Sequence, residues 1–357
     1  MLSLKDREWR KFQIGSLFDI KIGKAIDGNK VDLSKGKNAY ITRKENNNGL
    51  DGFLDYDQNY LNTQFPVITI GNETAEPFVQ IFPFFTGTKV NILSSKEDIS
   101  IFALMFVTQS IKMNKAKYSY TFTMNSTRLR KQNILLPADA YGNPDWQFME
   151  DYIRERERLM LEEYIAHAKR TLAEIGNIEC ISSLKEKEWK PFYFNKIFTQ
   201  IQRGKRLKKD DHRAGKHPYV SSTASDNGVD GFVSNKEGVR IFDNCLTIAN
   251  SGSVGATFYH IYDFVASDHI TQLKNPDFTR YVYLFLAPII SRLSEKYSFN
   301  REINDKRIRK ELLLLPVDDN ANPDWVYMEQ YAKSIVKQQL GAYLCYKGKM
   351  LNLTVYY

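Results

Sequence analysis

Two stretches of the sequence concentrate positive charge beside small polar residues, and both are suited to binding phosphate. One runs from Arg203 to Arg213 and is followed by Lys216, and the other holds Arg301, Lys306, Arg307, Arg309 and Lys310. Lys and Arg bind phosphate oxygens, and neighbouring Gly and Ser let backbone N–H groups approach them. The chain has 50 Lys+Arg against 42 Asp+Glu, a formal net charge of +8. This balance favours a polyanionic partner, although a solvated charged surface explains either run taken alone.

The segment from Asn250 to Gly255 is a further candidate for phosphate contact. Its Gly and Ser residues suit either an anion-binding nest of backbone N–H groups or a plain hairpin loop. The variable loops also carry Arg, Lys, Asn and Ser, the residues that read base edges in a major groove. The chemistry that these residues indicate is therefore the binding of a nucleic acid.

Motifs for catalysis are weak or missing. Asn143-Pro144-Asp145-Trp146 is superficially similar to the N-P-P-[YF] motif with which amino-methyltransferases hold a flipped adenine. We reject that interpretation because the third position is Asp, the motif occurs twice, and no F-x-G-x-G cofactor loop precedes it. The sequence contains no phosphate-binding G-x-x-x-x-G-K-[ST] motif. A P-D…[DE]-x-K nuclease would have to pair Pro144-Asp145 with Glu188-Trp189-Lys190 across a long helix, which makes it a poor candidate.

Histidine and cysteine spacing gives no evidence of a metal site or a catalytic triad. Neither metal-ligand spacing nor a triad partner is found for His167, His212, His217, His260 and His269. The three cysteines are Cys180, Cys245 and Cys345, which lie far apart in the sequence and show no paired spacing. This argues against a disulfide framework or a zinc site and favours a reducing compartment. We therefore expect no cofactor, no metal ion and no catalytic residue.

An internal duplication defines the elements that must position the polar loops. The segment Asn143–Trp146 returns as Asn322–Trp325, so that the two Trp residues lie 179 positions apart (325 − 146). At the same offset, Asn48-Gly49-Leu50-Asp51-Gly52-Phe53 matches Asn227-Gly228-Val229-Asp230-Gly231-Phe232. Two repeats of this length indicate the duplication of a whole domain rather than a solenoid.

Each repeat is predicted to be an α+β domain, with strands first and helices packed on them. Asn-Gly followed by Asp-Gly is typical of hairpins, because both turns favour positive φ. Short apolar runs predict buried strands at Val67–Ile70 and Cys245–Ala249. Helices are predicted over Ile99–Ile111 and Tyr281–Leu293, with a linker at Ile175–Leu184.

Each copy of Asn-Pro-Asp-Trp is predicted to open a long helix. Asn is a good N-cap, Pro fits the first helical position, and Asp complements the helix dipole. Apolar residues recur at helical spacing after each copy, which predicts one narrow apolar face on each otherwise charged helix. Packing the helices against each other buries both faces most simply. The residues predicted for this interface are Trp146, Met149, Ile153, Met160, Trp325, Met328, Ala332 and Ile335.

The two repeats differ where loops are expected. Lys24–Lys30 in the first repeat corresponds to the longer, more basic Lys205–Arg213 in the second. Thr42–Asn46, which contains Arg43 and Lys44, corresponds to the uncharged Ser221–Ser225. A shared scaffold with divergent polar loops is typical of two binding domains that have different targets.

This organisation resembles the DNA-specificity subunits of type I restriction–modification systems and their close relatives in type IIB enzymes. The resemblance spans essentially the whole chain and is carried by Glu188-Trp189-Lys190, Leu246–Gly255, Phe264–His269 and Leu313–Pro316, with a weaker version in the first half. It implies two tandem homologous target-recognition domains, each followed by a long helix, and an antiparallel pairing of the helices as a spacer. The expected boundaries are 1–142 and 181–321 for the domains, 143–180 for the first helix and linker, and 322–357 for the second helix.

The resemblance also implies a non-catalytic subunit that reads a bipartite, asymmetric site on double-stranded DNA. Methyltransferase subunits, fused to or joined by an endonuclease subunit, are the implied partners. The helices look shorter than those of many type I members, which favours the type IIB-like variant. The residues expected to contact DNA are Lys24, Lys30, Arg43, Lys44, Asn72, Lys117, Arg128, Arg203, Lys205, Arg206, Lys208, Lys209, Ser221, Ser222, Asn250, Ser251, Ser253, Arg301, Lys306 and Arg307.

Two other functions stay open on the sequence alone. One is a self-contained DNA methyltransferase or nuclease, which the missing cofactor and metal motifs disfavour. The other is a tandem RNA- or glycan-binding module that stacks ligands on some of its 22 Phe and 21 Tyr, which the basic, polar character of the variable loops disfavours. No run approaches the roughly eighteen apolar residues of a membrane span, and the charged N-terminus is unlike a signal peptide. We therefore expect a cytoplasmic protein without a membrane partner.

Overall fold

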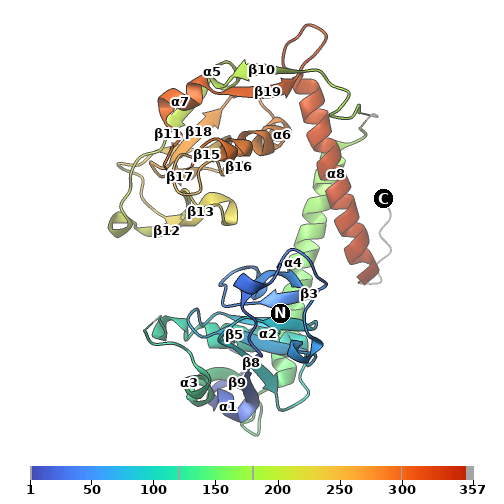
Figure 1. Cartoon of the computed structure of the whole chain (residues 1–357), viewed down its shortest axis with the longest axis vertical. Helices are drawn as coiled ribbons and strands as arrows, with labels where there is room; N and C mark the ends of the chain where they lie inside the picture. The colour runs from blue at the N-terminus through green and yellow to red at the C-terminus, as the bar shows by residue number, and fades with distance from the viewer. Residues whose placement is uncertain (1, 120, 179–180, 299, 351–357) are drawn as a thin grey trace. The chain divides into compact units, whose positions relative to one another are not determined.

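The structure is a computed structural model that describes residues 2–119, 121–178, 181–298 and 300–350. It divides into two compact units, Met1–Tyr164 and Ile165–Tyr357, which we call unit 1 and unit 2 (Figure 1). The division falls within the long helix α4 (Trp146–Ile175), whose first turns belong to unit 1 and whose last turns belong to unit 2.

Unit 1 is built from two sheets and a separate strand pair. The first sheet has the antiparallel order β2-β8-β5-β6, formed by β2 (Phe18–Ile22), β8 (Val90–Ser95), β5 (Val67–Gly71) and β6 (Pro77–Gln80). The second has the order β4-β3-β7, formed by β4 (Leu50–Leu54), β3 (Asn38–Ile41) and β7 (Phe84–Thr86), with β3 and β7 parallel. A pair is made by β1 (Glu8–Gln13) and β9 (Asn133–Ala138).

The apolar run in β5 is buried along its whole length because both faces of its sheet are covered. On one face, α2 (Ile101–Lys112) packs against β5, β6 and β9, and its apolar side chains share one core with Ile68, Ile70 and Met149. On the other face, Val67 and Ile92 pack against Ile41 of the second sheet. The predicted strand at Val67–Ile70 is confirmed, and so is the helix expected over Ile99–Ile111. The unit is completed by α1 (Ile14–Leu17) and α3 (Ser126–Lys131).

Unit 2 repeats this plan, which confirms the duplication. Its first sheet has the order β11-β18-β15-β16, formed by β11 (Gln200–Arg203), β18 (Ile270–Lys274), β15 (Cys245–Ala249) and β16 (Thr257–His260). Its second has the order β13-β12-β17-β14, formed by β13 (Val229–Val233), β12 (Ala214–Val220), β17 (Phe264–Ala266) and β14 (Ile241–Phe242). The strand pair is β10 (Trp189–Tyr193) with β19 (Leu312–Pro316), and the helices are α5 (Phe194–Ile197), α6 (Arg280–Ser291), α7 (Asp305–Lys310) and α8 (Trp325–Met350). The helix predicted over Tyr281–Leu293 corresponds to α6.

Only the first of the two predicted glycine turns exists in each repeat. Asn48 and Gly49 have φ of 55° and 74°, in the short turn between β3 and β4, as expected for Asn-Gly. Asp51-Gly52, in contrast, lies within β4, so the prediction of a second turn is wrong. Gly52 is required there for space, because an added Cβ would lie 2.5 Å from the carbonyl oxygen of Leu33.

The long helices begin where the Asn-Pro-Asp-Trp copies predict, but Asp and not Asn is the capping residue. The carboxylate of Asp145 accepts a hydrogen bond from the backbone N–H of Phe148 at 2.9 Å. Asp324 does the same for Tyr327 at 2.9 Å. A carboxylate at this position satisfies a free helical N–H and complements the helix dipole. The Asn residue precedes the cap and donates its own backbone N–H to an aspartate, Asp139 in the first copy.

At the start of each long helix, the apolar stripe lies in the core of the helix's own unit. Trp146, Met149 and Ile153 pack in the core of unit 1. Trp325, Met328 and Ala332 pack in the core of unit 2, which also contains Ile175 from the end of α4. Met160 and Ile335 of the predicted interface are 72% and 41% exposed. The helix starts are thus domain core, because the turn before each helix lays it directly on the sheets and α2 or α6.

Helix pairing is seen where the end of α4 enters unit 2. The amine of Lys337 on α8 donates to the carbonyl of Gly176, just after α4, at 2.9 Å. Tyr327, which lies earlier on α8, donates to the carbonyl of Ser182, later in the linker, at 3.0 Å. The two segments therefore run in opposite directions, and Figure 1 shows α8 beside the last turns of α4. None of the helices in the described parts of the chain combines the length and apolar character needed to cross a membrane.

Candidate nucleic-acid interface

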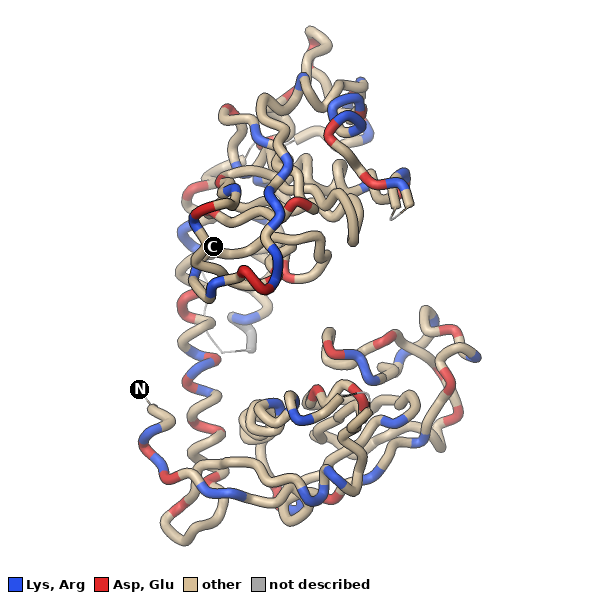
Figure 2. Tube along the Cα trace, turned by 90° about the vertical axis from the view of Figure 1, so that its left-hand side faces the viewer, with Lys and Arg blue, Asp and Glu red and all other residues tan. Residues whose placement is uncertain are grey.

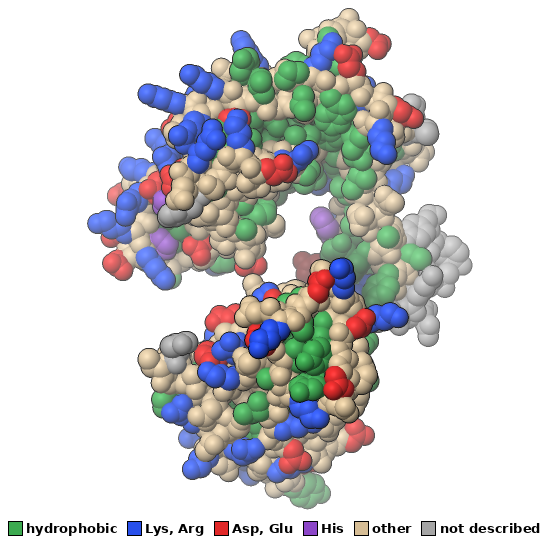
Figure 3. Space-filling model, viewed as in Figure 1, with side chains coloured by type: hydrophobic (Ala, Val, Ile, Leu, Met, Phe, Trp, Pro, Cys, Tyr) green, Lys and Arg blue, Asp and Glu red, His purple; other side chains and the backbone are tan. Residues whose placement is uncertain are grey.

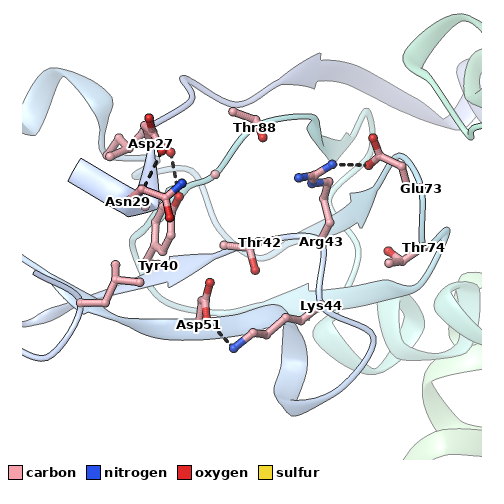
Figure 4. A pocket seen from close by; sticks show the side chains of 14 residues that line it. Asp27, Asn29, Tyr40, Thr42, Arg43, Lys44, Asp51, Glu73, Thr74 and Thr88 are labelled. Atoms are coloured by element: carbon pink, nitrogen blue, oxygen red, sulfur yellow. Dashed lines mark hydrogen bonds and ion pairs between the residues drawn. The ribbon is translucent and has the colours of Figure 1, made fainter. Parts of the chain in front are cut away.

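In unit 1, the loops at one edge of the two sheets surround an open hollow of about 550 Å³ (Figure 4). The loop after β2 is fixed there, because the N–H of Ile26 donates to the carbonyl of Thr86 at the end of β7. Tyr40 on β3 holds the same loop by donating its hydroxyl hydrogen bond to the carbonyl of Ile26 at 2.7 Å. Polar side chains from four loops and strand β4 therefore converge. The lining residues are Ile26, Asp27, Gly28, Asn29, Leu33, Tyr40, Thr42, Arg43, Lys44, Asp51, Glu73, Thr74, Gly87 and Thr88.

An ion-pair cluster occupies one wall of this hollow. Arg43 lies 2.8 Å from Glu73, and Lys89 lies 3.0 Å from the other oxygen of the same carboxylate. Burial alone would raise the pKa of Glu73, but its interactions with Arg43 and Lys89 outweigh burial and lower that pKa. Glu73 is therefore a stable anion that holds two cations at the edge of the sheet.

The other cations predicted for the first repeat are also held by their own unit. Lys44 forms an ion pair with Asp51, and Lys30 lies 3.7 Å from Asp27. Lys24 donates to the carbonyl of Asn59 at 2.6 Å. Lys117 donates to the side chain of Asn114 at 2.6 Å, and Arg128 donates to the carbonyl of Thr123 at 2.8 Å while lying over the ring of Phe122. These side chains lie at the surface with defined orientations.

The asparagines predicted to contact DNA are instead part of the scaffold. Asn72 is 8% exposed, and its side-chain oxygen accepts a hydrogen bond from Asn91 at 2.6 Å. Asn250 is 1% exposed and accepts from Thr271 at 2.8 Å. The sequence interpretation is wrong for both side chains, because the end of a buried strand carries them inward and leaves no edge free for a base.

The backbone of these asparagines fixes the correspondence between the units. The N–H of Asn72 donates to the carbonyl of Lys89, and that of Asn250 donates to the carbonyl of His269. The carbonyl of Asn72 accepts from Met124, and that of Asn250 accepts from Ile303. The two interfaces therefore share a main-chain frame, and positions after the matched strands can be compared directly.

The segment after β11 supplies several free cations to unit 2. Arg203 is held by the carbonyl of Asp268 at 2.5 Å, and Gly204 packs so closely that an added Cβ would lie 2.1 Å from the carbonyl oxygen of Ser267. Beyond this anchor the side chains are exposed, and among the described residues none of them forms an ion pair or hydrogen bond: Lys205, Arg206, Lys208 and Lys209. Figure 3 shows Lys and Arg side chains gathered on the side of unit 2 that carries β12 and α7 in Figure 1.

The serines of unit 2 are placed at the same edge. Ser221 donates to Asp230 at 3.1 Å, and the carbonyl of Ser222 accepts from the N–H of Ser253 at 3.0 Å. In the loop Asn250–Gly255, the N–H groups of Ser253, Val254 and Gly255 all donate to carbonyls of unit 2. The loop joins the antiparallel strands β15 and β16 as a hairpin, and its contact with phosphate stays a prediction.

Ser251, His269 and Asp268 form a contact that the sequence did not reveal. The hydroxyl of Ser251 is hydrogen-bonded to Nδ1 of His269, while Asp268 lies 3.9 Å from Nε2. In a hydrolytic triad the carboxylate holds one ring nitrogen within hydrogen-bond distance and the serine is open to substrate. Here the carboxylate is too far away and Ser251 is 5% exposed, so the three residues position the loop.

A second hollow, of about 530 Å³, lies beside β11, and its charged lining residues are Arg203, Arg240, Arg309 and Asp305. Arg240 donates to the carbonyl of Arg203, and Arg309 on α7 donates to that of Ile201 at 2.7 Å. Nothing in the sequence spacing connects Arg240 with the basic segments, so it was missed. Of the predicted residues nearby, Arg301 lies over the ring of Tyr297, Arg307 donates to the carbonyl of Glu302, and Lys306 is exposed on α7.

In the described parts of the chain, no three His, Cys, Asp or Glu side chains form a group that could hold a metal ion. Burial raises the pKa of the Cys245 thiol to about 12, so it stays protonated and inert. Cys345 is a free thiol, and Cys180 lies outside the described residues. Lys and Arg alternate with Asp and Glu along the trace of both units (Figure 2), so the interface is defined by which cations are free rather than by net charge.

Comparisons with known proteins agree with this architecture. The model of a family described as the type I restriction modification DNA specificity domain matches residues 6–164 and 186–342. The chain is 37% identical over 338 residues to the type II restriction enzyme BgcI specificity subunit S.BcgI of Heyndrickxia coagulans, with 94% of this chain and 96% of that protein covered. It is also similar to the solved S subunit of a type I restriction–modification system from M. genitalium, at 16% identity and a TM-score of 0.48, covering 99% of this chain and 95% of the other. The HsdS subunit from Thermoanaerobacter tengcongensis matches at 12% identity and a TM-score of 0.33, covering 94% and 90%.

Proposed function

The chain belongs to the family of type I restriction–modification DNA specificity subunits, and we propose that it reads a bipartite, asymmetric sequence on double-stranded DNA for the subunits that modify or cleave it. It is a non-catalytic, sequence-recognising subunit, as the members of this family are. The observation that carries the bipartite site is the duplicated interface, in which one main-chain frame presents different side chains in each unit. Two copies of one frame with different loops are suited to two different half-sites.

The residues proposed to contact DNA differ in the availability of their side chains. Lys205, Arg206, Lys208 and Lys209 are exposed and free of partners within the described chain, as phosphate-gripping side chains require. Arg43 and Lys44 are oriented by acidic partners around the hollow of unit 1, as base-reading side chains require. Ser221, Ser222 and Ser253 occupy the corresponding edge of unit 2, whereas Ser251 is buried there and bonded to His269. We keep Lys24, Lys30, Lys117, Arg128, Arg203, Arg301, Lys306 and Arg307 as flanking contacts to the DNA backbone.

The recognition domains are proposed to end where each Asn-Pro-Asp-Trp turn begins, giving residues 1–142 and 181–321. The long helices are then the spacer and the site where methyltransferase subunits dock, joined by or fused to an endonuclease. The apolar side chains that each helix leaves open to solvent, Met160 on α4 and Val326 on α8 among them, are the ones we propose for docking; they are 72% and 73% exposed. The relative at 37% identity is a subunit of a type II enzyme, which favours a type IIB-like system. The compartment that we propose for a protein with this kind of target is the cytoplasm.

Selection from randomised duplex DNA tests this function. The full chain, purified together with its modification subunit, is expected to enrich one motif made of two specified parts separated by positions without preference. The same motif should carry the methylated adenines of the source genome, and lose them when this chain is deleted. Recovery of unenriched DNA, or of single-stranded RNA in preference to duplex DNA, would refute the proposal. Methyl transfer by the isolated chain would instead establish the rival function of a self-contained methyltransferase.

A further inference from the structure

Arg43 is the side chain of unit 1 whose geometry is most suited to reading a single base. It lies two residues after the end of β3 and lines the hollow, where it is 39% exposed (Figure 4). One terminal nitrogen is committed to Glu73 at 2.8 Å, and no other bond of its side chain exists among the described residues. A guanidinium carries five N–H donors in a rigid plane, so a pair of donors remains for an incoming ligand.

The carboxylate that holds Arg43 is suited to positioning rather than to contact. Glu73 is 12% exposed, and its second oxygen is occupied by Lys89 at 3.0 Å. The cluster of Arg43, Glu73 and Lys89 therefore carries a net positive charge despite its acid. It presents a fixed guanidinium to polyanionic DNA without exposing a bare carboxylate that would repel it.

The matched positions of unit 2 hold no such cluster. Asn72 and Asn250 make the same backbone bonds, to Lys89 in unit 1 and to His269 in unit 2. One residue beyond these asparagines stand Glu73 and Ser251, and at the place of Arg43, 179 positions later, stands Ser222. Ser251 is bonded to His269, so that its hydroxyl is already engaged. Unit 2 has neither a guanidinium nor a carboxylate at these three positions.

From this difference we propose that Arg43 is a specificity-determining residue that reads a guanine in the half-site bound by unit 1, and that Glu73 and Lys89 position it. The inference rests on the proposed function as a DNA-reading subunit. The chemical reason is that guanine presents O6 and N7 as adjacent acceptors in the major groove, which two N–H donors of one guanidinium fit together. A lysine carries the same charge but lacks the planar fork, so it cannot replace Arg43 in this role.

The experiment compares base preferences of the full chain with its modification subunit, selected on randomised duplex DNA and then measured on single duplexes. For Arg43→Ala and Arg43→Lys we expect the preference for guanine at one position of one half-site to fall by about 5- to 150-fold, the range of a bidentate contact. Preferences at all other positions should be unchanged. Ser222→Ala, the matched control in the other repeat, should leave the guanine preference intact.

Glu73→Gln tests the positioning role separately. It removes the charge that holds Arg43 but keeps the shape, so the preference should relax at that same position and at no other, while the melting temperature of the protein stays close to that of the wild type.

Three results are decisive. Relaxation confined to one guanine position, not rescued by Arg43→Lys, supports the assignment. A uniform loss of affinity for all sequences that Arg43→Lys restores overturns it, because Arg43 would then grip a phosphate. If the wild type itself enriches no motif, the proposed function fails and the inference falls with it, and this outcome is recognised before any variant is measured.

Discussion

The sharpest prediction concerns Lys205, Arg206, Lys208 and Lys209 after β11, whose side chains have no ion pair or hydrogen bond among the described residues. Replacing Lys205, Arg206, Lys208 and Lys209 together by Ala removes four exposed positive charges and breaks no ion pair or hydrogen bond among the described residues. If each grips a phosphate, the slope of log K against log salt becomes shallower by up to about 3.6, because each neutralised phosphate contributes about 0.9. Over a salt increase from about 50 mM to about 200 mM, the wild type then loses up to about 150-fold more affinity than the variant.

The assay is a salt titration of binding to the cognate duplex, with the full chain and its modification subunit. The control removes positive charges that lie outside the loop edge, with Lys11, Lys185 and Lys196 replaced by Ala; all three are exposed. Per charge removed, the control should change the slope far less than the four loop substitutions. Because these four side chains form no ion pair or hydrogen bond among the described residues, the melting temperature of the quadruple variant should stay within a few degrees of the wild type.

Equal slopes for the wild type and the quadruple variant would refute the reasoning, since free cations that touch no phosphate release no counterions. A quadruple variant that loses preference for particular bases but keeps its salt slope would also refute it. That pattern would move these residues from backbone contact to base reading.

Three further predictions concern the scaffold. Glu76→Gln should lower the melting temperature at pH 7, because Glu76 is 5% exposed and two lysines bound to it outweigh burial and lower the pKa of its carboxyl group. The stability that this carboxylate contributes is lost as the pH falls through the lowered pKa. The melting temperatures of the variant and the wild type should therefore converge in acid. Gly52→Ala should destabilise unit 1 because its Cβ would lie 2.5 Å from a carbonyl oxygen, whereas Gly231→Ala, at the matched position with no atom within 4 Å, should be close to neutral in a thermal melt. Burial lowers the pKa of His260 from 6.5 to about 4, so its ring should titrate near that lower value by NMR, and the stability of unit 2 should decline as the pH falls from about 6.5 toward 4.

The positions of the main strands and helices could be predicted from the sequence because the same pattern occurs in both repeats. The run Val67–Ile70 and the repeated Asn-Pro-Asp-Trp each have a local physical cause, a doubly covered strand and a helix start, and both elements are present. The capping residue was assigned wrongly because Asn and Asp both cap well, and only the bond from Phe148 to Asp145 distinguishes them. The Asp51-Gly52 pair predicts a turn because glycine tolerates positive φ, whereas in the structure Gly52 makes room for Leu33.

The interface was less accessible, because the availability of a side chain depends on partners distant in the sequence. Lys205 and Arg43 look equivalent as basic loop residues, but of the two only Arg43 has an acid, Glu73, which the loop after β5 of the other sheet brings to it. Asn72 and Asn250 carry a good base-reading group and are nevertheless buried, because they continue strands that are covered on both faces. Arg240 lies in the hollow beside β11 because of the sheet topology, which the sequence spacing does not indicate.

The loops are held by the backbone and not by the side chains that they present, and this leads to a final, stronger prediction. In the variant, three residues of unit 1 are replaced by those at the matched positions of unit 2. The triple substitution Arg43→Ser, Glu73→Ser and Lys89→His removes the whole ion-pair cluster at once, so no charge is left without its partner. The bonds that fix these loops, from Asn72 to Lys89 and from Met124 to Asn72, are made by the backbone and survive the exchange. Since Arg43 and Lys89 are partly exposed, the ion pairs contribute at most about 1 kcal/mol each, and the triple variant should fold with a melting temperature near that of the wild type.

The DNA motif selected by the triple variant should keep the half-site bound by unit 2 and lose the guanine in the half-site bound by unit 1. Arg43→Ser alone should lose the same guanine, and if the triple variant unfolds while the single variants do not, the side chains of the cluster hold the loops and the prediction is wrong.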